Sequence, residues 1–150
     1  MITFETEKKK YSDLYSFILK CDPTMTDPLS KQVDLIKYTS KILDRAHILY
    51  AMNDSLIVGI MAYYFNKSPR NSFLTLLVVD ESCRGQGIGK ILLEKTLDFC
   101  KINYSAGVDL EVTCINERAV SLYKKKGFHI CDEYWDAAIC QNRYHMSLLF

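Results

Sequence analysis

The residues of this sequence most suited to chemistry form a glycine-rich loop between an apolar run and a helix-like segment. The loop spans residues 80–90 and reads Asp-Glu-Ser-Cys-Arg-Gly-Gln-Gly-Ile-Gly-Lys. Its three alternating glycines let the backbone approach a ligand and present N–H groups to it. The following helix adds the positive end of its dipole, and Arg84 and Lys90 add charge at the edge. These features predict a site for phosphate or pyrophosphate.

Two common nucleotide-binding patterns do not fit this loop. A P-loop has four residues between its first Gly and its Gly-Lys pair, followed by Ser or Thr. Here three residues separate Gly85 from Gly89, and Ile91 follows Lys90. The dinucleotide fingerprint needs a third glycine at position 90. For the loop taken alone, the alternative is a glycine turn without a ligand.

The wider pattern around the loop resembles the acyl-CoA motif of the GNAT superfamily of N-acetyltransferases. That pattern is Val79-Asp80-x-x-x-Arg84-Gly85-x-Gly87-Ile88-Gly89-x-x-Leu92-Leu93. A second signature of the superfamily is similar to Leu110-Glu111-Val112 and Asn116-x-x-Ala119-x-x-x-Tyr123-x-x-x-Gly127-Phe128. The two motifs are independent and in the expected order, and the resemblance covers residues 47–135.

The resemblance implies one α/β (α+β) domain over residues 1–150, with helices flanking a mixed, strongly twisted sheet whose central parallel strands splay apart. Acetyl-CoA would lie in the resulting V, its pantetheine arm on the backbone of residues 77–79 and its pyrophosphate on the N–H groups of residues 84–90. The small Ala119 would leave the cofactor room. The family works without a metal. The implied cofactor-binding residues are Leu77, Val78, Val79, Arg84, Gly85, Gln86, Gly87, Ile88, Gly89, Lys90, Asn116, Ala119 and Tyr123.

Acetyl transfer from a thioester to an amine needs a base for the ammonium, a donor for the oxyanion and an acid for the thiolate. A backbone N–H near Val79 is the expected oxyanion donor. Tyr123 stands at the family's tyrosine position and is the candidate acid; the alternative is a buried packing tyrosine. Glu111 is the candidate base, because burial between Leu110 and Val112 would raise its pKa. The alternative is a solvent-facing or purely structural glutamate.

The acceptor is expected to dock on residues 21–44, where Asp22, Asp27 and Asp34 would attract a cationic amine. Asp22, Tyr144 and His145 are the next candidates for the base. Acceptors compatible with the pattern are amino sugars or their nucleotide conjugates, polyamines, aminoglycosides, and protein N-termini or lysines. The Glu111–Tyr123 pair resembles protein N-terminal enzymes, whereas the whole chain is similar to small bacterial sugar-type members. A non-catalytic acyl-CoA sensor is the competing function. The sequence is also compatible with a homodimer.

The elements that must position these residues follow from periodicity and turn residues. Helices are predicted over residues 6–20, from about 30 to 44, 87–104 and 116–126, the last ended by Gly127. Strands are predicted over residues 46–52, 56–65, 72–80, 108–113, 128–135 and 143–150. The near-continuous apolar run at 72–80 indicates a strand buried on both faces.

Composition narrows the class of protein without naming a partner. The chain has 150 residues, 49% hydrophobic and 25% charged, and a net charge of +1. This balance argues against nucleic-acid binding, and the longest apolar run is too short to span a membrane. No secretory signal is recognisable, so we expect a cytoplasmic location and six reduced cysteines, most of them packing residues.

Overall fold

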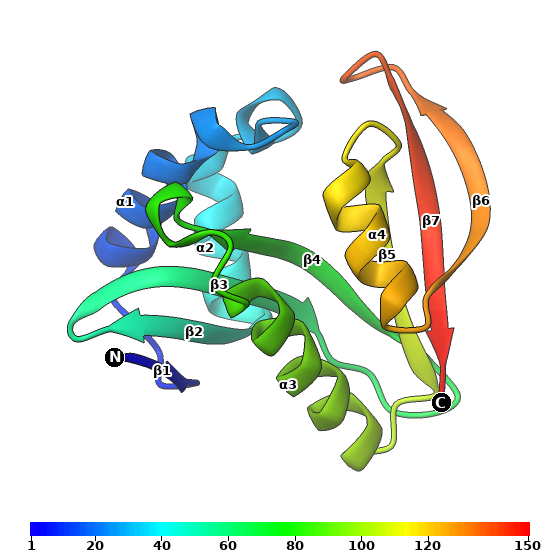
Figure 1. The fold of residues 1–150 in the computed structure, drawn as a ribbon, viewed down its shortest axis with the longest axis horizontal. Coiled ribbons are helices and arrows are strands. Elements are labelled where there is room, and N and C mark those ends of the chain that lie inside the picture. Colours follow the sequence, from blue (N-terminus) through cyan, green and yellow to red (C-terminus); the bar gives the residue numbers. More distant parts are fainter.

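A seven-stranded sheet in the order β1-β2-β3-β4-β5-β7-β6 runs through the computed structural model, which describes residues 1–150 (Figure 1). Its strands are β1 (Ile2–Glu5), β2 (His47–Asn53), β3 (Leu56–Tyr64), β4 (Ser72–Val79), β5 (Gly107–Thr113), β6 (His129–Asp136) and β7 (Gln141–Leu149). The helices are α1 (Tyr11–Cys21), α2 (Leu35–Arg45), α3 (Ile88–Ile102) and α4 (Glu117–Lys125). Three short 3₁₀ turns are η1 (Asp22–Thr24), η2 (Leu29–Lys31) and η3 (Glu81–Cys83).

The sheet opens between β4 and β5, its only parallel pair. These strands are paired only where Ser72–Leu74 meets Val108–Leu110. Beyond Leu74 they diverge and divide the sheet into two arms, which Figure 1 shows as a V. Thr75 is the first residue of β4 without a partner on β5, and the Tyr38 hydroxyl of α2 donates to its carbonyl at 3.3 Å. The splayed mixed sheet that the family resemblance implied is confirmed.

Strands β2, β3 and β4 are covered on both faces. Side chains on one face, such as Met61, join a core with α3, and those on the other, such as Ile60, join a core with α1 and α2. Because successive side chains in a strand point to opposite faces, one apolar run supplies both cores. This double coverage explains the continuous apolar pattern of β4.

Two N-terminal predictions were wrong. The first helix begins at Tyr11 rather than at residue 6, and Ile2–Glu5 forms the edge strand β1 against β2. The second helix begins at Leu35 rather than near residue 30. Asp34 caps it by accepting hydrogen bonds from the N–H groups of Ile36 and Lys37, at 3.0 and 3.2 Å. The capping carboxylate therefore sets this boundary.

All six cysteines are free. Cys21 and Cys100 are buried, whereas Cys131 and Cys140 are exposed on the β6–β7 hairpin. The expectation that most cysteines are packing residues is therefore wrong for the hairpin. None of the helices combines the length and apolar character needed to cross a membrane.

Candidate functional site

Two adjoining cavities occupy the opening between β4 and β5. The cavity beside the glycine loop has a volume of about 390 Å³, and its neighbour about 200 Å³. We call them the loop-side cavity and the β5-side cavity. The residues that line both are Met25, Thr26, Leu77, Asn116 and Ala119. A molecule in the loop-side cavity therefore shares walls with a molecule in the β5-side cavity.

The glycine loop presents an uninterrupted row of unused backbone donors. Gly85 and Gly87 have φ angles of +80° and +79°, in the left-handed region that glycine adopts without strain. The backbone N–H groups from Gly85 to Lys90 donate no hydrogen bond within the protein. Because α3 begins at Ile88, the last of these groups also lie at the positive end of its dipole. This arrangement suits a phosphate or pyrophosphate.

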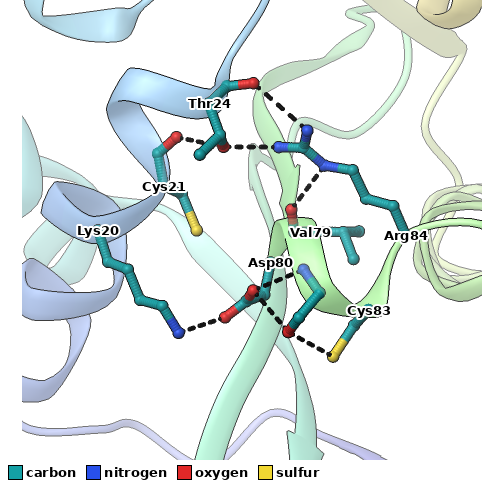
Figure 2. Close-up of polar contacts among 8 residues, drawn as sticks. Lys20, Cys21, Thr24, Val79, Asp80, Cys83 and Arg84 are labelled. Atoms are coloured by element: carbon teal, nitrogen blue, oxygen red, sulfur yellow. Dashed lines mark hydrogen bonds and ion pairs between the residues drawn. The ribbon is translucent and has the colours of Figure 1, made fainter.

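Arg84, at the start of this loop, uses its guanidinium for hydrogen bonds within the protein, all of them to neutral acceptors. Its Nε donates to the Val79 carbonyl at 3.2 Å, and its Nη2 donates to Thr24 Oγ1 at 2.8 Å. Figure 2 shows the guanidinium turned toward η1. The Arg84 N–H is also used, by the Glu81 carbonyl at 3.3 Å. The row of free N–H groups therefore begins at Gly85.

Asp80 stabilises the turn that leads into the glycine loop. Its carboxylate accepts a hydrogen bond from Lys20 Nζ at 2.7 Å and another from the Ser82 N–H at 3.0 Å (Figure 2). The Lys20 ammonium and then the Ser82 N–H lower the pKa of Asp80. The carboxylate thus joins α1 to the loop while ordering the turn that leads into it.

Most of the cofactor residues implied by the resemblance line the loop-side cavity. Those found there are Leu77, Val78, Val79, Arg84, Gly85, Gly87, Ile88, Gly89, Lys90, Asn116 and Ala119. Gln86 is absent from this lining, and Tyr123 lines the β5-side cavity instead. Asn116 also caps α4, because its Oδ1 accepts the Ala119 N–H at 3.3 Å.

A basic recess adjoins the loop-side cavity. The sequence suggested that the lysine run 124–126 could meet the 3′-phosphate of CoA, but it did not indicate that Arg118 belongs to the same recess. Its cationic side chains are those of Lys90, Arg118, Lys125 and Lys126. Arg118 lines both the recess and the loop-side cavity. It lies in the first turn of α4, where a cation opposes the helix dipole. That unfavourable placement was a usable signal in the sequence.

Tyr123 lines the β5-side cavity from α4. Its side chain is 8% exposed, and burial raises its pKa to about 12. Its ring packs edge-to-face on Phe128, with the ring centroids 5.6 Å apart. The phenol is therefore packed against Phe128 and remains protonated at neutral pH.

Glu111 lines the same cavity from β5, but its expected burial is wrong. Leu110 and Val112 are buried against the α3 and α4 side, and the alternation of the strand leaves Glu111 exposed on the opposite face. The carboxylate lies beside the hydroxyl of Tyr134 on β6. Burial and then the Glu111 carboxylate raise the pKa of Tyr134 to about 12. Glu111 thus has a polar neighbour rather than an apolar pocket.

Of the three aspartates expected to attract an amine, only Asp27 lines the β5-side cavity. Asp22 is buried, and its carboxylate accepts hydrogen bonds from the N–H and hydroxyl of Ser30 at 2.9 and 2.6 Å. Asp34 caps α2. These carboxylates order the connection between α1 and α2, so they have structural partners that the sequence pattern did not reveal.

The two remaining base candidates, Tyr144 and His145, do not line the β5-side cavity. His145 is the register partner of Glu111 on β7, and its Nε2 lies 3.8 Å from Asp109 Oδ1. Tyr144 instead lines a separate recess beside α4.

Arg143 closes one side of the β5-side cavity and was not predicted. It is 9% exposed, and its Nε donates to Asp136 Oδ2 at 2.8 Å. Its Nη2 donates to the Gln32 side chain, which lies between η2 and α2. This contact joins β7 to the α1–α2 connection. The Arg143 charge is already paired with a carboxylate.

No group of three or more His, Cys, Asp or Glu side chains is arranged to hold a metal ion.

The chain matches the model of the Acetyltransferase (GNAT) family over residues 12–128, and it belongs to that family.

The comparisons also identify individual relatives. Over 78 residues the chain is 33% identical to the N-acetylaspartate synthetase of Xenopus tropicalis, a match that covers 52% of this chain and 29% of that protein. It therefore spans less than a third of this curated relative.

Solved structures match over almost the whole chain. The ribosomal-protein-S18-alanine N-acetyltransferase of Escherichia coli matches with a TM-score of 0.80 and 19% identity, covering 99% of this chain and 94% of that one. A chain of the NatC complex bound to Gag peptide and CoA matches with a TM-score of 0.78 and 16% identity, covering 99% and 98%. At these identities the structural matches show a shared fold.

Proposed function

We propose that this protein is an acetyl-CoA-dependent N-acetyltransferase that moves an acetyl group to a primary amine by direct attack. The row of unpartnered N–H groups from Gly85 to Lys90 carries the proposal, because it opens onto a cavity that adjoins the one lined by Glu111 and Tyr123. The anionic acetyl-CoA on the glycine loop would thus lie next to the acid–base pair of Glu111 and Tyr123.

The cofactor would be held mainly by backbone groups. The pyrophosphate would accept from the N–H groups of Gly85–Lys90. The pantetheine arm would lie along Leu77–Val79, where β4 has no partner strand on the β5 side and only the Val79 carbonyl is already used, by Arg84 Nε. The basic recess around Arg118 suits the 3′-phosphate of CoA. CoA in the NatC structure, which shares this fold, supports the same kind of ligand here.

In the reaction, Glu111 would take a proton from the ammonium, directly or through a water molecule. The amine then forms its bond to the thioester carbon, and a backbone N–H near Val79 would stabilise the oxyanion. Collapse breaks the carbon–sulfur bond and releases the thiolate of CoA. The nitrogen loses its second proton, which passes through water to that thiolate, and Glu111 returns the first proton to solvent. Because the pKa of Tyr123 is about 12 and that of a thiol is about 8.5, Tyr123 would stabilise the thiolate mainly as a hydrogen-bond donor.

The β5-side cavity favours an acceptor with positive charge. It presents the carboxylates of Asp27 and Glu111, whereas its one cation, Arg143, is paired with Asp136. Amino sugars, polyamines, aminoglycosides and protein N-termini all meet this requirement. The names of the relatives include both a small amino acid product and an alanine of a ribosomal protein, so the panel must contain free and protein-borne amines.

The direct test measures CoA binding by calorimetry and thiol release from acetyl-CoA across such an amine panel. We expect binding, and turnover with at least one cationic amine that falls in Tyr123→Phe. Binding without turnover on any amine would favour a non-catalytic acyl-CoA sensor. Failure to bind CoA would refute both functions.

A further inference from the structure

Arg84 joins the connection between α1 and α2 to the glycine loop through hydrogen bonds. Nη2 and Nη1 of its guanidinium donate to the hydroxyl and the carbonyl of Thr24, at 2.8 and 3.3 Å. Its Nε donates to the Val79 carbonyl at 3.2 Å. Thr24 also donates to the Cys21 carbonyl at 2.7 Å, so its hydroxyl is fixed from both sides (Figure 2). These contacts join segments 60 residues apart in the chain.

The residues that follow Thr24 form the wall between the two cavities. Met25 and Thr26 line both, and Asp27 lines the β5-side cavity. The Met25 N–H donates to the Asp22 carbonyl at 3.2 Å, which ends the η1 turn. Contacts that fix the position of Thr24 therefore also restrict the residues of this wall, which follow it directly in the chain.

Arg84 stands immediately before the free N–H groups of Gly85–Lys90. The planar guanidinium donates in several directions at once, which the point charge of a lysine cannot do with fixed geometry. A second contact, the ion pair between Lys20 and Asp80 at 2.7 Å, joins the last turn of α1 to the start of the same loop. Arg84 itself is exposed, and hydrogen bonds at exposed sites open readily. A ligand that orders the loop would keep these bonds closed.

We propose that Arg84 is a positioning residue of the acceptor site: its contacts to Thr24 couple occupation of the glycine loop to the order of the Thr24–Asp27 wall. This inference depends on the proposed function, because it takes CoA as the ligand of the loop. Cofactor binding thereby completes the acceptor pocket. The coupling is reciprocal, so an acceptor that orders the wall also tightens CoA binding.

The experiment follows backbone amides by NMR with CoA as the probe, and it needs no acceptor. Chemical shifts of the Gly85–Lys90 amides report whether CoA occupies the loop. Hydrogen exchange of the Met25 amide reports whether the wall responds. In the unaltered protein we expect saturating CoA to slow Met25 exchange by about threefold or more.

Two variants break the contact in different ways. Thr24→Val removes the hydroxyl at nearly constant volume, and Arg84→Lys keeps the charge but loses the fork. Both should still show the loop shifts at saturating CoA, while Met25 exchange no longer responds to CoA. The matched controls Thr6→Val and Arg45→Lys alter exposed residues outside both cavities and should behave like the unaltered protein.

The outcomes separate the two proposals. Loop shifts without any change at Met25, or a full Met25 response in both variants, would refute the coupling and leave the proposed function standing. Absence of loop shifts would refute the proposed function and the coupling with it. Thermal unfolding of each variant establishes that it is folded before the exchange is measured.

Discussion

Glu111 and Tyr123 line one cavity from consecutive elements, yet Glu111 is exposed and Tyr123 is 8% exposed. The strand alternation of β5 turns Glu111 away from the core, whereas α4 holds the phenol between the arms of the sheet. One site therefore contains a solvent-exposed carboxylate and a buried phenol. Different environments of this kind let neighbouring groups serve as base and acid.

The substitution Tyr123→Phe tests whether Tyr123 acts as the acid. We expect Tyr123→Phe to lower kcat by about ten- to a thousandfold, because the departing thiolate loses its donor. The Kd for acetyl-CoA should hardly change, since Tyr123 does not line the loop-side cavity. Steady-state kinetics and calorimetry measure both quantities. Turnover within about twofold of the parent enzyme would remove Tyr123 from the mechanism.

Replacement of the carboxylate tests the base. Glu111→Gln should lower kcat/KM at neutral pH by about a hundredfold, because the enzyme must then wait for free amine. Its rate should rise about tenfold per pH unit below the pKa of the amine, whereas the parent enzyme responds less steeply. A pH–rate series measures the difference. An unchanged profile would assign the base elsewhere, and Asp27 would be tested next.

Two glycines of the loop should respond differently to alanine. Gly87 has φ +79°, so Gly87→Ala should destabilise the fold by about 1 kcal/mol and weaken CoA binding. Gly89 has no positive φ, and a Cβ there meets only Val79 Cγ2 at 3.7 Å, an ordinary contact. Gly89→Ala should therefore keep full stability. Urea denaturation and CoA titration compare the pair, and equal stability losses would contradict the backbone argument.

The basic recess can be tested with two forms of the cofactor. Arg118→Gln should weaken binding of CoA by about fivefold and leave dephospho-CoA unaffected, because only CoA carries the 3′-phosphate. Arg45→Gln, a charge change far from the recess in sequence and absent from its lining, is the control. Equal losses for both cofactors would place the 3′-phosphate elsewhere.

The Lys20–Asp80 pair gives a stability contribution with a defined pH window. The pKa of Asp80 is lowered by Lys20 and the Ser82 N–H, so its contribution holds above about pH 4 and is lost as the pH falls through the folded-state pKa. The hydrogen bond that Lys20 donates to Asp80 raises the pKa of Lys20, so the Lys20 contribution holds below about pH 10 and is lost as the pH rises further.

Asp80→Asn should therefore be less stable than the parent by about 0.5 kcal/mol at pH 7, a small value because Lys20 is 69% exposed and solvent screens the pair. The difference should vanish near pH 2. Urea denaturation at both pH values measures it, and Asp44→Asn, at an exposed pair with Arg45, should show no loss. A loss that persists at pH 2 would assign the effect to something other than charge.

Local patterns predicted the elements whose signals are contained within a few residues. The glycine loop was readable because positive φ angles and free N–H groups depend on neighbouring residues alone. The strands of the two-sided core were readable from their apolar runs. Strand β1 was missed because it has four residues, and its place in the sheet depends on pairing with β2.

The sequence by itself determined the glycine-rich loop with its free N–H groups, the main strands and the order of the acetyltransferase motifs, because each depends on chemistry within one short segment. Only the tertiary structure decided that Arg84 binds Thr24, that Gln32 meets Arg143 across 111 residues, and that Glu111 lies on the open face of β5. These contacts arise where the two arms of the sheet and the α1–α2 connection come together. Their geometry depends on how those units pack, and no single segment contains that information.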